Sequence, residues 1–266
     1  MSELRVIFIG DVFGRPGRRA VCAKLGSLRS SFNPHFVVAN GENAAGGRGI
    51  TEQTANDLFD SGVDVLTLGN HSFANRQCYS FLNRDPRVIR PANYPPSKEL
   101  PGRGFGVFEK DGFSLGIANI VGRVFMDAVD CPFLCADKII EENKHLNIPI
   151  LIDFHAEATS EKKAFANYLD GRIFAVVGTH THVQTSDEVI LPNGTAYITD
   201  AGMSGVADSI IGMDKSIIIN KFITKLPNKF IVAEGDACVQ GVLIKCNTET
   251  MLADQINRFI VFEKED

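Results

Sequence analysis

The sequence lacks any apolar run approaching the ~20 residues that a helix needs to cross a bilayer. The segment from Met1 to Arg5 leads straight into a short strand-like run, without the apolar stretch and cleavage site of a secretory signal peptide. These absences argue against a membrane protein and a secreted one. We therefore expect a cytoplasmic protein with no membrane partner.

Clusters of positive charge are also missing. No block of lysine or arginine exceeds two or three residues, and the formal net charge is -5. Such a chain has no broad basic surface for a nucleic-acid backbone, so we expect no strong nucleic-acid binding. A small phosphate-bearing ligand remains compatible with this composition.

The six cysteines include no C-x-x-C pair. Cys131 and Cys135 lie four residues apart, but no second pair with the spacing of a zinc site accompanies them. We therefore expect reduced, partly buried thiols, as in a cytosolic protein.

With 266 residues, of which 44% are hydrophobic, the chain is long enough for one full core or two small ones. No linker, repeat or low-complexity tract divides it, and we expect a single domain over residues 1–266. Strand-like and helical patterns alternate over the first 90 residues, which predicts a parallel sheet covered by helices.

Beyond residue 104 the pattern changes to hairpins mixed with helices. The runs 110–112 and 192–194 are typical of hairpin turns. We expect strands at 4–9, 36–39, 63–68, 106–109, 114–120, 148–154, 173–177, 188–191, 195–199, 230–233 and 239–245, and helices at 18–31, 52–60, 136–146, 160–169 and 214–224. The end of the chain is ambiguous, since 251–256 could be helical whereas 260–262 is extended in character. Two packed sheets with outer helices fit this order best.

Polar residues with metal-binding chemistry follow several of the strand-like runs. They are Asp11, Glu42, Asn43, Asn70, His71, His155, His180 and His182. In open α/β sheets, ligands bind beyond the carboxyl ends of the strands. A single Asp, Asn or His in such a place usually belongs to a turn or a packing contact. Four of the six histidines occupy these positions, however, and the whole set predicts a metal site.

His180 and His182 give the strongest indication. They follow the apolar run 173–177, and an extended chain places residues i and i+2 on the same side. We therefore expect both imidazoles to leave the end of the strand in one direction, which suits metal binding better than packing.

The size of the set favours two metal ions over one. Imidazole, carboxylate and amide ligands suit manganese, iron or zinc, and one ion takes about four to six ligands. Eight candidate groups fit two ions that share a bridging carboxylate. Ions ~3.5–4 Å apart acidify a bound water and neutralise the phosphoryl oxygens during attack on a phosphate ester.

Several stretches of the chain resemble the calcineurin-like metallophosphoesterases, and more closely the YmdB family, known as 2′,3′-cyclic-nucleotide phosphodiesterases. The stretches are FIGDVFGRPG (8–17), NGENAAG (40–46), RPAN (90–93), DFHAEATSEK (153–162), VGTHTHVQT (177–185) and TDAGM (199–203). The resemblance covers nearly the whole chain. It implies a four-layer α/β/β/α sandwich and a two-metal centre that holds iron or manganese, with zinc as an alternative.

The resemblance also implies a role for each candidate ligand. One ion would be held by Asp11 and His182, with the candidate ligand Asn43 nearby, and the other by Asn70, His155 and His180. Glu42 would bridge the two ions. The family further implies self-association, as a dimer or tetramer, to which the apolar segments 209–213 and 217–219 could contribute; they are equally compatible with the core.

His71 would be the general acid of the reaction that the resemblance implies. A metal-bound hydroxide would attack the phosphorus of a 2′,3′-cyclic nucleotide or another phosphodiester, and His71 would protonate the departing ribose oxygen. Arg48, in a run of glycines that permits close approach, could meet a substrate phosphate, although a plain turn explains that run equally well.

The chain departs from the family directly after His71. Relatives generally carry an aromatic residue and then Asp, whereas this chain has Ser72-Phe73-Ala74. We expect the missing acid to remove an orienting partner or a loop anchor for His71, which would weaken activity or shift its pH optimum.

Two further functions fit the same ligands. One is a phosphomonoesterase or nucleotidase, because the substrate is recognised by loops whose preference the sequence does not reveal. The other is a metal-binding regulatory protein of RNA metabolism with little turnover, which the Ala74 departure favours and the absence of a basic stripe disfavours.

Overall fold

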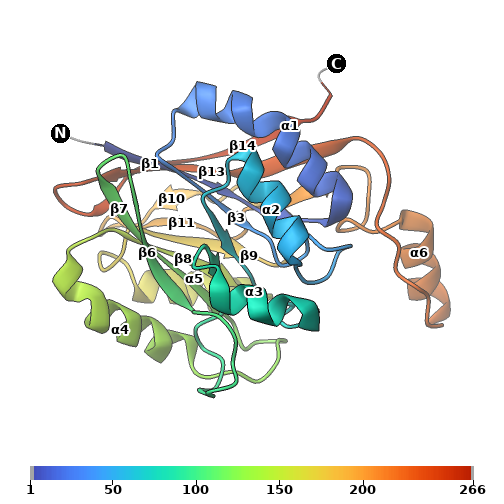
Figure 1. Cartoon of the computed structure of the whole chain (residues 1–266), viewed down its shortest axis with the longest axis horizontal. Coiled ribbons are helices and arrows are strands. Elements are labelled where there is room, and N and C mark those ends of the chain that lie inside the picture. The colour runs from blue at the N-terminus through green and yellow to red at the C-terminus, as the bar shows by residue number, and fades with distance from the viewer. Residues whose placement is uncertain (1–2, 265–266) are drawn as a thin grey trace.

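The computed structural model describes residues 3–264, which form two β-sheets packed face to face between two groups of helices (Figure 1). The larger, eight-stranded sheet has the order β2 (Asp11–Val12), β12 (Met203–Val206), β13 (Ala237–Asn247), β1 (Glu3–Ile9), β3 (Phe36–Asn40), β4 (Val65–Thr67) and β5 (Val88–Ile89), with β14 (Leu252–Phe262) also paired to β13. The six-stranded sheet has the order β10 (Val189–Ile190), β11 (Ala196–Ile198), β9 (Ala175–Thr179), β8 (Ile150–His155), β7 (Phe113–Val121) and β6 (Phe105–Lys110).

Helices cover the outer face of each sheet. The larger sheet is covered by α1 (Gly14–Phe32), α2 (Glu52–Ser61) and α3 (Tyr79–Arg84), and the smaller by α4 (Pro132–Asn143) and α5 (Thr159–Tyr168), at the bottom of Figure 1. Short 3₁₀ turns at Arg76–Cys78 and Lys144–Leu146 adjoin α3 and α4. This arrangement confirms the predicted four-layer α/β/β/α sandwich.

The alternation of apolar side chains along β1 explains why the sheet is buried on both faces. Val6 and Phe8 point into the core between the two sheets, while Ile7 and Ile9 pack beneath α1 and α2. Burying each such side chain stabilises the fold by about 1.5–3 kcal/mol. Both faces of β1 are therefore apolar, and the first candidate site residue, Asp11, comes after the end of this strand at Ile9.

The local signals at the helices are confirmed in detail. Thr51 caps α2 by accepting a hydrogen bond from the backbone N–H of Thr54, and the Thr54 hydroxyl accepts one from the N–H of Thr51. Gly62 ends the same helix in the left-handed conformation, with φ of 110°. α1 begins earlier than predicted, at Gly14, with Pro16 in its first turn.

Parallel pairing brings the carboxyl ends of the central strands together. β1, β3, β4 and β5 run parallel in the larger sheet, and β7, β8 and β9 run parallel in the smaller. The loops that follow β1, β3 and β4 therefore leave the same edge of one sheet, opposite the ends of β8 and β9 in the other. The candidate residues lie in these loops and strand ends.

One of the predicted elements is wrong. Residues 230–233 form no strand: Val232 makes only an isolated bridge to Met213, and the side chains of Phe230 and Ile231 are about half exposed. The segment left ambiguous between helix and strand is extended, because Leu252–Phe262 pairs along its length with β13. The hairpin 188–199 is confirmed, but its second strand also pairs in parallel with β9.

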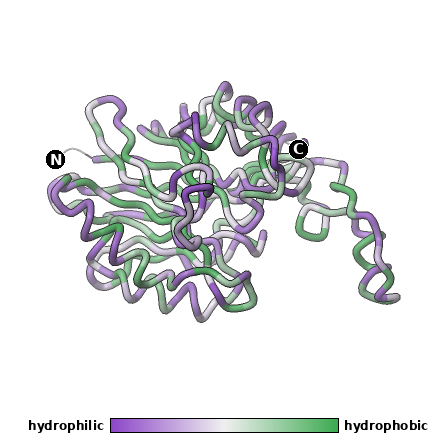
Figure 2. Tube along the Cα trace, turned by 60° about the horizontal axis from the view of Figure 1, so that its bottom comes forward, coloured by the Kyte–Doolittle hydropathy of each residue, from purple (hydrophilic) through white to green (hydrophobic). Residues whose placement is uncertain are grey.

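The last helix, α6 (Lys215–Thr224), projects from the two-sheet body, as both Figure 1 and Figure 2 show. Its N-terminus is capped by Asp214, whose carboxylate accepts a hydrogen bond from the N–H of Ile217. We refer to residues 209–231 as the arm. A search of the helices between residues 3 and 264 finds none long and apolar enough to span a membrane.

Candidate active site

The histidine pair that follows β9 is placed by a different geometry from the one predicted. The strand ends at Thr179, and His180 and His182 have φ angles of 101° and 64°. The chain is therefore not extended here, and the alternation argument for a shared direction is wrong. Both rings nevertheless line the same cavity, because the positive φ angles turn the chain sharply around the strand end.

Each of these histidines has its outer ring nitrogen bound to an acceptor. Nε2 of His180 lies 3.2 Å from a carboxylate oxygen of Glu157, and Nδ1 of His182 lies 3.0 Å from the carbonyl oxygen of Ile211. A proton on the outer nitrogen leaves the inner nitrogen with a free lone pair. This is the arrangement in which histidines bind metal ions.

His155, at the end of β8, is fixed in the same way. Its Nδ1 lies 2.9 Å from the hydroxyl oxygen of Thr179, which in turn donates to Asp153 at 2.6 Å. Asp153 also accepts from Asn40 and Thr67. All of this network is buried, so Nε2 of His155 is directed inward with little freedom to rotate.

The inner nitrogens converge on one point. Nε2 of His155 lies 3.0 Å from Nδ1 of His180, 3.0 Å from the side-chain oxygen of Asn70 and 3.2 Å from a carboxylate oxygen of Glu42. The ligand atoms of Glu42, His155 and His180 all lie within 4.8 Å of one another. Two imidazole lone pairs at this separation repel unless a proton or a cation lies between them.

The electrostatics of the cluster show the same need for positive charge. Burial lowers the pKa of His155, but Glu42, Asp11 and Asp153 outweigh it and raise the pKa to about 9. Burial and the neighbouring His155 lower the pKa of His180 to about 3. Burial opposes ionisation of Glu42, yet His155 and His71 hold its pKa well below the ordinary value. A proton on His155 thus supplies the charge that a metal ion would supply.

A second group of ligands lies on the other side of Glu42. Asp11 is fully buried; its Oδ2 accepts from the N–H of His180 at 3.1 Å, whereas Oδ1 has no hydrogen-bond partner within residues 3–264. Nε2 of His182 lies 3.6 Å from that oxygen. A buried carboxylate oxygen without a partner is costly, and burial raises the pKa of Asp11. These donors fit a second metal ion.

Asn43 connects this group with His71. Its amide nitrogen lies 3.1 Å from Glu42 and 3.2 Å from Nε2 of His182, and its oxygen lies 2.8 Å from Nδ1 of His71. The amide oxygen would reach a metal ion only after the amide rotates. Nδ1 of His71 also lies 3.4 Å from Glu42, so the ring is held by two partners and lines the cavity.

The cavity beside these residues has a volume of about 610 Å³. Of the predicted residues, Glu42, Asn43, His71, His180 and His182 line it. Arg48 is exposed and does not line this cavity, although its neighbour Gly47 does. Its role in substrate binding stays a prediction.

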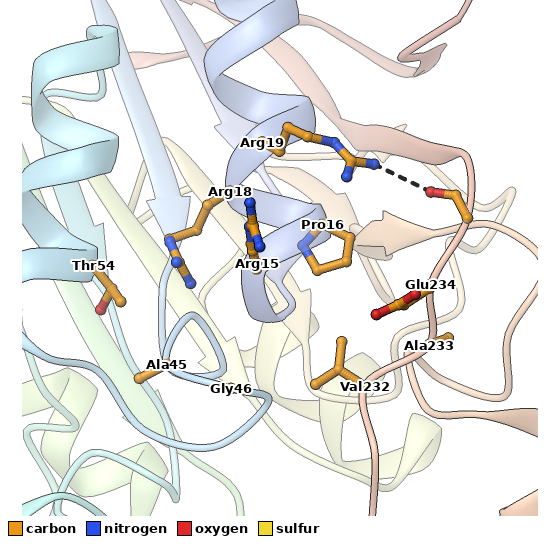
Figure 3. Close-up of a pocket in the computed structure, with 11 residues that line it drawn as sticks. Arg15, Pro16, Arg18, Arg19, Ala45, Gly46, Thr54, Val232, Ala233 and Glu234 are labelled. Carbon is orange, nitrogen blue, oxygen red and sulfur yellow. Dashed lines mark hydrogen bonds between the residues drawn. The ribbon is translucent and has the colours of Figure 1, made fainter.

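A second cavity, of about 560 Å³, is lined in part by Ala45 and Gly46 (Figure 3), whereas the next residue, Gly47, lines the first cavity. Three arginines of α1, Arg15, Arg18 and Arg19, line it. Arg18 is paired with Asp57 and Arg19 with Glu263. None of the predicted metal ligands reaches this cavity, so the candidate active site is the first one.

One buried ion pair beneath the site was not assigned a role from the sequence. Nζ of Lys162 donates to a carboxylate oxygen of Asp200 at 2.8 Å and to the carbonyl oxygen of Thr179 at 2.8 Å, and both side chains are fully buried. The same oxygen of Asp200 accepts from the backbone N–H of Thr181 at 3.0 Å and from its hydroxyl at 2.8 Å. The pair therefore fixes the chain on both sides of His180. Lys162 and Asp200 fall within the stretches quoted above, but a lysine on a helix gives no sequence signal of burial.

A two-layer sheet core with histidines, carboxylates and amides gathered at the strand ends defines the class of metallophosphoesterases of the calcineurin-like type. Family comparison matches residues 7–259 to the YmdB-like proteins. A 2′,3′-cyclic-nucleotide 2′-phosphodiesterase of Bacillus subtilis is 47% identical over 258 residues, which cover 97% of each chain. The protein belongs to the YmdB-like family.

Solved structures agree with this assignment. A hypothetical protein of Thermus thermophilus superimposes with a TM-score of 0.90 at 42% identity, covering 98% of this chain and 100% of that one. A protein of Mycoplasma pneumoniae described as a novel phosphatase gives a TM-score of 0.92 at 30% identity, covering 98% and 94%. The NAD nucleotidase of Haemophilus influenzae, at 16% identity, shares the fold over 56% of its chain with a TM-score of 0.64.

The buried ion pair yields a test of how the site is supported. Replacing Lys162 with Met leaves the carboxylate of Asp200 buried without its cation, and we expect the free energy of unfolding to fall by about 3–5 kcal/mol. The double variant Lys162→Met, Asp200→Asn should recover part of this loss. Urea denaturation measures both.

Lys163→Met is the matched control, because Lys163 is the next residue and is exposed. It should change stability by less than about 0.5 kcal/mol, as surface substitutions usually do. Equal effects of the two single substitutions would show that the Lys162–Asp200 pair does not support the site.

Proposed function

We propose that this protein is a two-metal phosphodiesterase that hydrolyses 2′,3′-cyclic nucleotides and related phosphodiesters. The observation that carries the proposal is the convergence of the inner nitrogens of His155 and His180 on Glu42, each with its outer nitrogen bound to an acceptor. The activity named for the Bacillus subtilis relative supports the substrate class.

The proposed ligands fall into two groups that meet at Glu42. Asn70, His155 and His180 would hold one ion, and Asp11, His182 and Asn43 the other, with Glu42 between them. When bound, the two ions would acidify a water molecule and neutralise charge on the phosphoryl group. Imidazole and carboxylate donors suit iron or manganese, and zinc is the alternative.

His71 would act as the general acid. Its Nδ1 can donate to the oxygen of Asn43, 2.8 Å away, and this contact helps to fix the ring in the cavity. As the general acid, the ring would carry the transferable proton on Nε2. As water adds to phosphorus and the bond from phosphorus to the 2′-oxygen breaks, this proton passes to the 2′-oxygen of the ribose.

Phosphomonoesterase activity is the second candidate, because the Mycoplasma pneumoniae structure is described as that of a phosphatase. The same residues would hold the metals and protonate the leaving group. Comparing the rates on 2′,3′-cyclic AMP and on adenosine 3′-monophosphate separates the two functions. Full metal occupancy with no turnover on either ester would favour the regulatory alternative.

We also propose that residues 1–266 form one domain in a cytoplasmic protein. The core between the two sheets is shared by strands from the whole length of the chain, which supports a single domain. All six cysteines are free, as expected in a reducing compartment. Two separate unfolding transitions in calorimetry would contradict the single domain.

A metal analysis tests the assignment of the ligands. We expect purified protein to contain about two ions per chain, iron or manganese, since a two-metal centre is required for the proposed reaction. Asp11→Asn and His180→Ala should each lower the ratio to about one, because they remove ligands of different ions, while Glu42→Gln should affect both. Elemental analysis after extensive dialysis measures the ratio.

Asp208→Asn, at an exposed carboxylate, serves as the control for this series. A loss of both ions in either the Asp11→Asn or the His180→Ala variant would contradict the division of the ligands into two groups.

The general acid is tested by replacing His71 with Asn. We expect the rate on 2′,3′-cyclic AMP to fall about 10²–10⁴-fold, the usual contribution of a general acid, while the metal content stays unchanged. His145→Asn changes an exposed histidine outside the site and should leave the rate unaltered. A His71→Asn variant as active as the parent would remove His71 from the mechanism.

The arm supports the expectation of a homo-oligomer. Ile219, Ile223, Leu226 and Ile231 are 50–77% exposed, and exposed apolar clusters of this kind mark contact surfaces. We expect light scattering to give the mass of a dimer or tetramer, and Ile223→Lys to shift the mass toward the monomer. A monomeric parent protein would contradict the proposal.

A further inference from the structure

The wall of the active-site cavity has a different chemistry from its floor. The floor carries the proposed metal ligands and His71. The wall is apolar and is formed by one residue of the loop before α1 together with part of the arm: Phe13, Ile210, Ile211, Met213, Ile218, Phe222 and Phe230. Binding a phosphate group alone requires no such wall.

The wall begins directly at a proposed metal ligand. The carbonyl oxygen of Ile211 accepts from Nδ1 of His182, and the ring of Phe13 lies edge-on to the imidazole of His182 with ring centroids 5.3 Å apart. A single ligand could therefore place one part against the wall and another part at the floor. A nucleoside cyclic phosphate has this form, with a flat base joined to a charged ring phosphate.

Two aromatic residues of the wall, Phe222 and Phe230, are available to a ligand. Phe222 is 68% exposed and Phe230 is 47% exposed, although both line the cavity. Large apolar side chains left open beside a polar site commonly serve a ligand. Base stacking on aromatic rings is favourable for every base, because each base has a π-face.

The charge of the arm suits an anionic ligand. Residues 209–231 include four lysines and a single acid, Asp214, whereas the whole chain is negative. Nζ of Lys221 lies 4.2 Å from the centroid of the Phe230 ring, and both residues line the cavity. The ammonium lies over one face of the Phe230 ring and brings positive charge to this side of the cavity, where it can attract a phosphate.

We propose that Phe222 and Phe230, with Ile211 and Lys221, form a nucleobase-binding subsite that makes the enzyme prefer nucleotides to smaller cyclic phosphates. The proposal rests on the proposed function, since the phosphate is placed at the metal ligands. The aromatic and aliphatic side chains of the wall have no group to read the hydrogen-bonding edge of a base. The subsite should therefore accept all four bases and favour the larger purines.

The test compares a substrate that has a base with one that lacks it. We would measure kcat and KM for 2′,3′-cyclic AMP and for 1-O-methyl-ribose 2,3-cyclic phosphate. Phe222→Ala and Phe230→Ala should each raise KM for the nucleotide about ten-fold, the size of one lost base stack. Neither variant should change kcat, or KM for the base-free substrate. Equal losses on both substrates, or none on either, would overturn the subsite.

Two controls separate stacking from the position of the arm. Ile223→Ala changes a residue of the same helix that does not line the cavity. Phe262→Ala removes a phenylalanine of β14 that is 48% exposed, close to the exposure of Phe230. Both should leave KM for the nucleotide unchanged. If Ile223→Ala raised KM as much as Phe222→Ala, the effect would come from docking or assembly of the arm, and the subsite would be rejected.

A binding measurement keeps this inference separate from the proposed reaction. Calorimetry of the parent and both phenylalanine variants with adenosine 3′-monophosphate and with ribose 3-phosphate requires no turnover. If the phenylalanine variants bind the adenosine compound about ten-fold more weakly than the parent does, and bind ribose 3-phosphate equally well, the subsite is supported. This holds even if neither cyclic phosphate is hydrolysed, because the absence of hydrolysis would overturn only the proposed reaction. Unchanged binding of the adenosine compound overturns the subsite whatever the rates.

Discussion

The repulsion between the inner nitrogens of His155 and His180 is the constraint on which the rest of the site depends. The two atoms lie 3.0 Å apart, and neither ring can turn away, because Thr179 binds the outer nitrogen of one and Glu157 that of the other. Only positive charge between them relieves this contact. The buried carboxylates of Glu42 and Asp11, on the opposite side, are also stabilised by positive charge. The folded chain therefore holds its donor atoms in positions that suit bound cations.

Holding such a cluster requires a rigid frame, and the two sheets provide it from opposite sides. Glu42 and Asn70 come from loops of the larger sheet, whereas His155 and His180 come from strand ends of the smaller one. The distance between the two groups is thus set by the packing of apolar side chains such as Val38 and Val177 between the sheets. The Lys162–Asp200 pair adds a second restraint, because it fixes the loop that carries His180 from below. The packing between the sheets and this polar contact together restrict side chains that would be mobile on an ordinary surface loop.

Much of this arrangement could be predicted from the sequence, for reasons that the structure makes clear. Strand ends are marked by short apolar runs, and parallel strands bring their ends together, so the gathering of Asp11, Glu42, Asn70 and His155 followed from local patterns. The left-handed conformations of His180 and His182 could not be foreseen, because they depend on restraints from residues distant in sequence such as Asp200. The strand predicted at residues 230–233 does not form, because these apolar residues belong to the arm and to the wall of the cavity. A run of apolar residues does not reveal whether it packs in a sheet or lines a cavity.

The structure shows what surrounds Ala74, where an acid was expected from the family resemblance. His71 is oriented by Asn43 and Glu42, so it does not depend on residue 74 for a hydrogen-bonding partner. The methyl group of Ala74 instead lies against the glycine loop, 3.3 Å from the point where a Cβ of Gly49 would stand. A side chain at position 74 therefore begins beside Gly49, in the loop that carries Arg48. The effect of Ala74 on activity and on the pH optimum stays a prediction.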